Sequence, residues 1–183
     1  MRLVILGGPG AGKGTQARRL SNDLHIPLIS TGDILREAIA AQTELGRQAQ
    51  PYVEKGELVP DRTMIKFISN RLQMLDAGSS WLLEGYPRTA FQAEELDFLL
   101  EELQQQLNWA IWLDVPEAVT IERCLGRSRP DDRSEVIQRR IQLFYDRTMP
   151  MMEYYDWRQR LLKINGDQMP DQVQQEILAK LSS

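Results

Sequence analysis

A glycine-rich run directly after the first apolar segment constrains the fold of this chain more than any other feature. Leu3–Leu6 is followed by Gly7-Gly8-Pro9-Gly10-Ala11-Gly12-Lys13, which has the spacing G-x-x-x-x-G-K, and then by a helical pattern. Glycines let the backbone turn with its N–H groups pointing inward, the helix N-terminus adds partial positive charge, and the lysine reaches terminal phosphates. A strand, this loop and a helix in succession predict a nucleotide-phosphate site at the end of a strand.

Four further apolar runs end in turn or polar residues and precede helical patterns. They are Pro27–Ile29, Trp81–Leu83, Ala110–Leu113 and Leu161–Ile164. Strands that are apolar on successive residues and alternate with helices indicate a parallel sheet covered on both faces. We therefore expect an α/β fold, a five-stranded parallel sheet flanked by helices, in one domain of 183 residues. Trp109, Trp112 and Trp157 are expected in its core.

Composition narrows the classes of function. The net charge is −4, which disfavours a nucleic-acid binder, and the longest apolar runs of four or five residues are too short to span a membrane. Cys124 is the single cysteine, so neither an intrachain disulfide nor a cysteine-based zinc site is expected. Seventeen arginines against five lysines favour bidentate phosphate recognition. A cytoplasmic enzyme acting on phosphorylated small molecules fits these features.

The ends of the second and third strands carry residues with two interpretations. Ser30-Thr31-Gly32-Asp33 is a helix capping box, and Arg36 could simply pair with Asp33 on that helix. After the third strand, Pro87 is expected near a helix start, which places Arg88 in the first turn, where the helix dipole disfavours a cation. An anionic ligand explains that placement better than a plain turn does.

The arginines near the fourth strand also divide into two cases. Arg123 and Arg127 share one face of a helix ending near Gly126, where a solvated surface is the simpler interpretation. Arg140 instead falls within the apolar stripe of Val136, Ile141 and Phe144, on a helix expected to begin around Asp132. A guanidinium on an inward face needs a carboxylate or a phosphate as its partner.

Four motifs together resemble the adenylate kinase family in its short-lid form. They are Gly7–Thr15, Ser30–Asp33, Gly85–Gln92, and the Arg123/Arg127 pair followed by Asp131-Asp132. They occur in the family's order and span nearly the whole chain. The resemblance implies reversible phosphoryl transfer from MgATP to AMP, giving two ADP, with segment 30–59 closing over AMP and a short lid at 126–132. It also implies a monomer.

The resemblance assigns roles to individual residues. It implies that Lys13, Arg88, Arg123, Arg129 and Arg140 are catalytic. The ATP-binding residues would be Gly10, Ala11, Gly12, Lys13, Gly14, Thr15, Arg127 and Gln168. The AMP-binding residues would be Thr31, Arg36, Glu57, Leu58, Val59, Gly85, Tyr86, Pro87, Arg88, Gln92, Arg129 and Arg140.

Metal binding is expected to be indirect. Gly14 stands directly after Lys13, with the hydroxyl one residue later at Thr15, so we expect Mg²⁺ to be held by nucleotide phosphates and water. The resemblance places Asp33 and Glu84 near that ion. This chain has Glu84 and Tyr86 where the family usually has Asp and Phe. A lid of about seven residues with Cys124 alone predicts no zinc.

Two alternatives remain. A UMP/CMP kinase has the same architecture, but Thr31, Thr89 and Gln92 favour adenine, since the pyrimidine enzymes usually have Ala at the position of Thr31 and Asn at that of Thr89, directly after the Pro-Arg pair. A nucleotide-dependent switch would use the same loop. The guanine-reading N-K-x-D and the L-S-G-G-Q signature are both missing from the sequence, which disfavours a switch.

Overall fold

The structure is a computed structural model that describes residues 1–126 and 133–182. Within these ranges five strands form one parallel sheet in the order β2-β3-β1-β4-β5. The strands are β1 (Arg2–Leu6), β2 (Leu28–Ser30), β3 (Trp81–Glu84), β4 (Trp109–Asp114) and β5 (Leu161–Asn165). The predicted five-stranded parallel sheet is confirmed, with each strand within about one residue of its apolar run.

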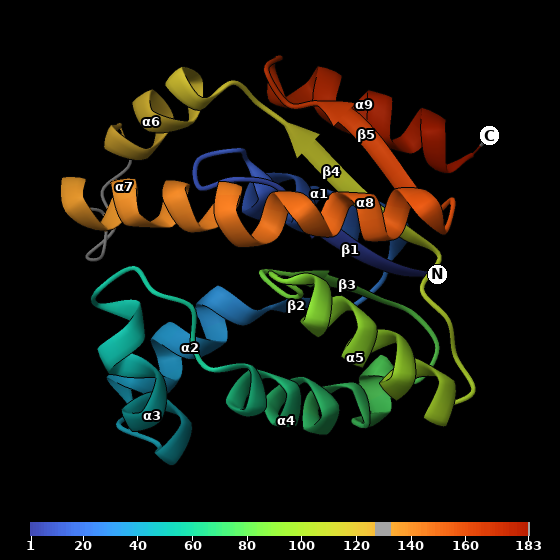
Figure 1. Ribbon diagram of the computed structural model, residues 1–183. Coiled ribbons are helices and arrows are strands. Elements are labelled where there is room, and N and C mark those ends of the chain that lie inside the picture. The colour runs from blue at the N-terminus through green and yellow to red at the C-terminus, as the bar shows by residue number, and fades with distance from the viewer. Residues whose placement is uncertain (127–132, 183) are drawn as a thin grey trace.

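Helices cover the sheet and extend beyond it (Figure 1). They are α1 (Lys13–Leu24), α2 (Thr31–Ala40), α3 (Glu44–Val53), α4 (Asp61–Leu72), α5 (Ala90–Glu102), α6 (Glu117–Leu125), α7 (Ser134–Leu143), α8 (Met149–Trp157) and α9 (Pro170–Leu181). Two short turns complete the described chain, the 3₁₀ turn η1 (Leu75–Ala77) and the π-helical turn η2 (Phe144–Thr148). No helix of the described chain has the length and apolarity that crossing a membrane requires.

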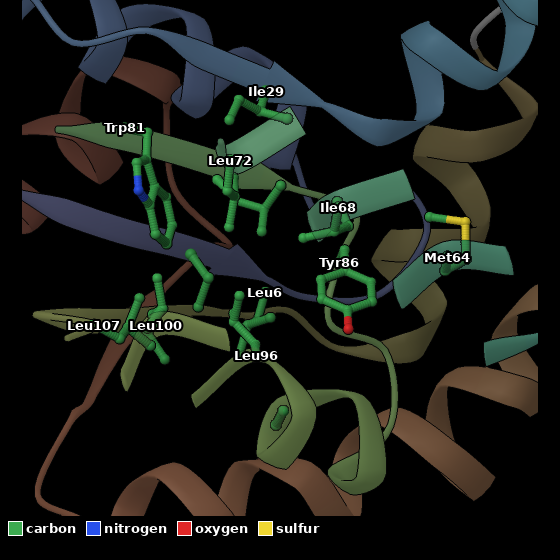
Figure 2. Packing of buried hydrophobic residues seen from close by; sticks show 14 of the residues in the cluster. Leu6, Ile29, Met64, Ile68, Leu72, Trp81, Tyr86, Leu96, Leu100 and Leu107 are labelled. Carbon is green, nitrogen blue, oxygen red and sulfur yellow. The ribbon is translucent and has the colours of Figure 1, made fainter. Parts of the chain in front are cut away.

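The central strand β1 separates two apolar layers. Leu3 and Ile5 face a cluster built with α1 and α9, whereas Val4 and Leu6 face a larger cluster built with α4, α5 and α8. Figure 2 shows part of the larger cluster, with Trp81 and Tyr86 packed among leucines and isoleucines. Each buried leucine or isoleucine contributes about 1.5–3 kcal/mol. The sheet is therefore held rigidly from both faces.

Of the three tryptophans expected in the core, Trp109 and Trp112 pack against it, but Trp157 does not. Trp81 is fully buried in the larger cluster, and Trp109 and Trp112 are half-buried. Trp157, expected in the core, is 87% exposed at the end of α8. Residue type alone predicts burial poorly at a helix end, where the chain leaves α8 for the short turn before β5.

Hydroxyl caps fix where the helices beside the sheet edge begin. The Ser30 hydroxyl accepts the backbone N–H of Asp33 at the start of α2, and the Thr89 hydroxyl accepts that of Gln92 at the start of α5. Such caps contribute about 1 kcal/mol each and satisfy N–H groups that the helix cannot. Strands β1, β2 and β3 are parallel, so the segments that follow them all begin at the carboxyl ends of the strands.

Candidate active site

The loop between β1 and α1 has the geometry of an anion cradle. Gly12 occupies the N-cap position of α1 with φ +91°, a left-handed conformation that glycine adopts without strain. Because glycine has no side chain to cap the helix, the first N–H groups of α1 remain available to a ligand. Lys13 Nζ donates to the carbonyl oxygens of Gly7 and Gly8, both at 2.8 Å. The ammonium is thereby held at the mouth of the loop.

One pocket of about 570 Å³ joins this loop to the ends of β2 and β3. Its volume is typical of a small-molecule site, and it lies beyond the carboxyl ends of strands on both sides of β1, where open parallel sheets bind ligands. Cationic side chains from separate elements line it: Lys13, Arg18, Arg36, Arg88, Arg123 and Arg140. Such a concentration of positive charge favours a polyanionic ligand.

Arg88 lies in the segment between β3 and α5 and lines the pocket. Its Nε donates to the carbonyl oxygen of Gly85 at 2.8 Å, and the carbonyl oxygen of Arg88 accepts the Thr148 hydroxyl at 2.8 Å. Burial lowers the pKa of Arg88, Glu84 partly offsets that effect, and the nearby charges of Arg140 and Arg36 lower it further. The site therefore holds a desolvated cation that an incoming phosphate would stabilise.

The position of Arg88 corrects one sequence prediction. Helix α5 begins at Ala90 with Thr89 as its N-cap, so Arg88 lies before the helix and not in its first turn, and Pro87 belongs to the preceding turn. The interpretation based on the helix dipole is wrong. Desolvation of the guanidinium explains its need for an anion instead.

Residues expected to bind AMP gather at one end of the pocket. Those lining it are Thr31, Arg36, Glu57, Leu58, Val59, Gly85, Tyr86, Pro87, Arg88, Gln92 and Arg140. The Thr31 hydroxyl donates to the Glu84 carbonyl oxygen at 3.0 Å. Gly85 has φ +88°, and a Cβ there would collide with the Thr31 hydroxyl oxygen, so glycine is required. The two strand ends are thus packed directly together.

Residues expected to bind ATP gather at the other end. Gly10, Ala11, Gly12, Lys13, Gly14, Thr15, Arg123 and Gln168 line the same pocket. Arg123 Nη1 donates to the Gly166 carbonyl oxygen at 3.0 Å, and its Nη2 lies 3.4 Å from Asp167. The Gln168 amide donates to the Asn165 carbonyl oxygen and the Glu176 carboxylate. Arg127 and Arg129, with lid positions 127–132, lie outside the described residues.

Two carboxylates, Asp33 and Glu84, also line the pocket. Asp33 pairs with Arg36 and, at 3.8 Å, with Arg18, while Glu84 Oε2 accepts the Ser30 hydroxyl at 2.9 Å. Partial burial opposes ionisation of Asp33, but the hydrogen bonds from Arg36 and Ser30 and the charges of Arg36 and Arg18 together outweigh it and lower the pKa of Asp33. In the described ranges no group of three or more His, Cys, Asp or Glu side chains is placed to hold a metal ion.

Several pocket residues were missed in the sequence. Arg18 follows Gly14 by four residues on α1, so helical periodicity could have placed it beside the loop. Phe144 and Thr148 reach the pocket from η2, a π-helical turn that a 3.6-residue period does not predict. Asp61 does not line the pocket but accepts a hydrogen bond from the Gln92 amide at 2.7 Å, and the sequence analysis did not single it out either.

Comparison with known proteins places the chain in a family. A family model described as adenylate kinase matches residues 5–160. Adenylate kinase 2 of Nostoc sp. strain PCC 7120 is 65% identical, over 99% of this chain and 98% of the relative. Adenylate kinase 2 of Synechocystis sp. strain PCC 6803 is 57% identical, over 99% of this chain and 100% of the relative. With this similarity over the full sheet and pocket, the chain belongs to the adenylate kinase family.

Proposed function

We propose that this protein catalyses reversible phosphoryl transfer from MgATP to AMP, giving two molecules of ADP. One observation supports this most strongly. The phosphate loop before α1 lines the same pocket as Thr31 and Gln92, which are expected to bind AMP, and arginines from separate elements line it as well. Two nucleotides bound at these ends would meet through their phosphates.

The donor would lie along the phosphate loop. The N–H groups of the loop and of the first turn of α1 would bind the β- and γ-phosphates, with Lys13 leaving its contacts with the Gly7 and Gly8 carbonyl oxygens to join them. Arg123 would approach the same phosphates from α6, and the backbone near Gln168 would border the adenine. Arg127 would add a further cation to this end.

The acceptor would lie between α2 and the turn after β3. Arg36 and Arg88 would bind the AMP phosphate, the backbone of Glu57–Val59 would border its nucleoside, and Thr31 and Gln92 would face the base. Segment 30–59 would act as a cover that closes on this nucleotide. Closure matters because water in the pocket would otherwise accept the phosphoryl group.

The reaction needs no general base. A phosphate oxygen of AMP is already deprotonated; it forms the bond to the γ-phosphorus as the bond from that phosphorus to the β-phosphate oxygen breaks, and ADP leaves. Catalysis is then positioning and electrostatic stabilisation of the transferring group. Arg88 and Arg140 enter the pocket where that group would pass, and Arg129 is proposed to join them.

The residues present fit a magnesium requirement of the kind that nucleotide phosphoryl transfer has. Mg²⁺ prefers oxygen ligands and keeps several waters, and Asp33 and Glu84 supply carboxylate oxygens at the pocket wall. These side chains would hold water molecules on a metal ion whose direct ligands are nucleotide phosphates. The bound ion would neutralise charge on the transferring group. We propose that zinc has no part, because Cys124 is the single cysteine in the sequence.

A coupled assay with purified protein tests the proposal. MgATP would be offered with AMP, CMP or UMP in turn, and nucleoside diphosphates would be separated and counted. We expect two ADP per turnover with AMP and far slower reaction with the pyrimidine nucleotides. Faster reaction with UMP or CMP would make the protein a pyrimidine nucleotide kinase, and ATP hydrolysis without transfer would contradict kinase activity.

A further inference from the structure

Gln92 is held by partners on every side. Its Nε2 donates to Asp61 Oδ1 at 2.7 Å, and its Oε1 accepts the backbone N–H of Arg88 at 2.8 Å. Its own N–H donates to the Thr89 hydroxyl at 3.1 Å, and its carbonyl oxygen accepts the Tyr86 hydroxyl at 3.2 Å. Only 2% of the residue is exposed. Neither its backbone nor its side chain is free to drift.

The two partners of the Gln92 amide have opposite hydrogen-bonding character. An ionised carboxylate only accepts hydrogen bonds, and a backbone N–H only donates them. If the amide turned over, its NH₂ would face the Arg88 N–H and its oxygen would face Asp61 Oδ1, so both bonds would be lost. The surroundings therefore permit one orientation of the amide.

That orientation leaves a defined pair of groups for a ligand. A carboxamide has two N–H donors and two oxygen lone pairs, and one of each is already used here. Gln92 lines the pocket, and its remaining acceptor and donor would be available to a base bound beside it. Adenine matches them with its 6-amino donor and N1 acceptor. Hypoxanthine and guanine present the reverse, a 6-oxo acceptor and an N1–H donor.

We propose that Asp61 is a positioning residue for base recognition, which fixes the Gln92 amide so that the acceptor site takes a 6-aminopurine nucleotide and rejects a 6-oxopurine nucleotide. The inference rests on the proposed function, because it concerns the AMP end of that site. Asp61 is not among the described residues that line the pocket, so it acts through Gln92. Cytosine presents the same donor and acceptor as adenine, so CMP must be discriminated by size.

A purely structural role for Asp61 has a matched control elsewhere in the chain. Asp61 is the first residue of α4 after the N-cap Pro60, where a carboxylate stabilises the helix dipole. Glu117 has the same position in α6 after the N-cap Pro116. Glu117→Gln removes a first-turn charge without touching Gln92, and Asp61→Asn removes one while keeping the shape of the side chain.

The experiment compares AMP and IMP as acceptors at saturating MgATP. It measures kcat and KM for the wild type, Asp61→Asn and Glu117→Gln. The wild type should prefer AMP by about 100-fold or more in kcat/KM, because IMP leaves buried polar groups unpaired. Asp61→Asn should lower that preference about tenfold or more, mainly through KM, since an asparagine tolerates either orientation of the amide. Glu117→Gln should keep the wild-type preference.

Each outcome separates this inference from the proposed function. Partial unfolding of Asp61→Asn would lower the rates with AMP and IMP by the same factor and would not change their ratio. The ratio therefore reports on the folded molecules alone, and a ratio equal to that of the wild type overturns the inference. Equal use of AMP and IMP by the wild type also overturns it, even if no variant folds. An equal drop in ratio for Glu117→Gln would assign the effect to helix stability. Failure to phosphorylate either nucleotide contradicts the proposed function itself.

Discussion

At the scale of single residues, Arg88 is a pocket cation whose pKa is lowered by burial. Its guanidinium is fixed by the Gly85 carbonyl oxygen, and burial lowers the pKa of Arg88 while Arg36 and Arg140 repel it. A phosphate bound there would relieve both the desolvation and the repulsion. The interaction of Arg88 with the phosphates should be stronger in the transition state of phosphoryl transfer than in the bound substrates.

Replacing Arg88 tests this role. We expect Arg88→Ala to lower kcat by about 100-fold or more, given the ~10³ to 10⁵ associated with a transition-state arginine. Arg71→Ala is the matched control, because Arg71 bonds Asp76 at 2.9 and 2.7 Å away from the pocket. Steady-state kinetics check both variants. Turnover of Arg88→Ala within tenfold of the wild type would remove Arg88 from the mechanism.

Tyr86 shows what a departure from the family pattern contributes. Burial raises the pKa of Tyr86, so its hydroxyl stays protonated and donates to the Gln92 carbonyl oxygen at 3.2 Å. Tyr86→Phe should lower the free energy of unfolding by about 1 kcal/mol, the worth of one hydrogen bond, and leave kcat within about twofold. Urea unfolding and steady-state assays measure the two effects. A stability loss above about 3 kcal/mol would show that the ring packing had changed as well.

Some residue placements could be predicted from sequence and others could not. Lys13 and the loop glycines follow from a local motif, and Arg140 follows from helical periodicity; both line the pocket. The environment of Arg88 could not be predicted correctly, because its backbone carbonyl oxygen accepts the Thr148 hydroxyl and its guanidinium lies near the charge of Arg140, and both come from elements more than 50 residues later. Long-range desolvation leaves no local pattern.

At the scale of elements, the segment after α3 is tied to α7. Arg139 on α7 donates to both oxygens of Glu57, at 2.6 and 3.1 Å, and Arg133 donates to the Glu54 carbonyl oxygen at 3.1 Å. In Figure 1 the loop after α3 reaches toward α7. These contacts hold the backbone of Glu57–Val59, which is proposed to border AMP, against the rest of the pocket.

Removing the ion pair should loosen that segment. Arg139→Ala is expected to raise KM for AMP about two- to fivefold with little change in kcat, the scale of an exposed ion pair. Arg158→Ala is the control, because Arg158 lies 3.7 Å from Asp97 away from this contact. Kinetics at low and high salt check the cause, since screening should shrink the difference. A difference that persists in high salt would contradict an electrostatic origin.

The same pair predicts a pH dependence. The hydrogen bond from Arg139 lowers the pKa of Glu57 below its usual 4.5, and Arg139 stays charged throughout. A lowered carboxylate pKa means that the contribution is complete above about pH 4.5 and is lost as the pH falls through the lower, folded-state value. The stability gap between wild type and Arg139→Ala should therefore be constant above about pH 5 and close below it. Thermal unfolding from pH 3 to 8 measures this, and a gap that widens in acid would contradict it.

Among the elements, the strands were predicted well. The strands are apolar on successive residues and lie between two cores, which is why their runs match the sheet closely. The junction of α7 and α8 was not predicted, because η2 adds residues to a helical turn and so rotates Phe144 and Thr148 into the pocket. A π-helical turn is a tertiary outcome that the sequence pattern does not encode.

At the scale of the whole molecule, the sheet is the rigid part, and the pocket lies beyond the carboxyl ends of its strands. Two apolar layers pack against the two faces of β1. Segments that follow the strands of the sheet line the pocket. A ligand that contacts several of these pocket segments at once should stabilise all of them when it binds. The order of the strands was predictable only as a parallel set, because register and neighbours are fixed by packing.

Two adenosines joined through five phosphates would bridge both ends of the pocket. At about 100 times its dissociation constant such a mimic should add about 2.7 kcal/mol of stability and raise Tm by roughly 5–10 °C in a chain of this size. ATP alone and AMP alone at the same concentration should give smaller shifts. Differential scanning fluorimetry measures all three. A shift with the mimic no larger than with ATP alone would mean that only one end is occupied.

A crystal structure of the protein with that mimic tests the central claim most directly. The account predicts one adenosine against Thr31 and Gln92, the other beside Gln168, and the phosphate chain crossing Lys13, Arg88 and Arg140. A mimic that binds outside this pocket, or that places both adenosines at the same end, would contradict it.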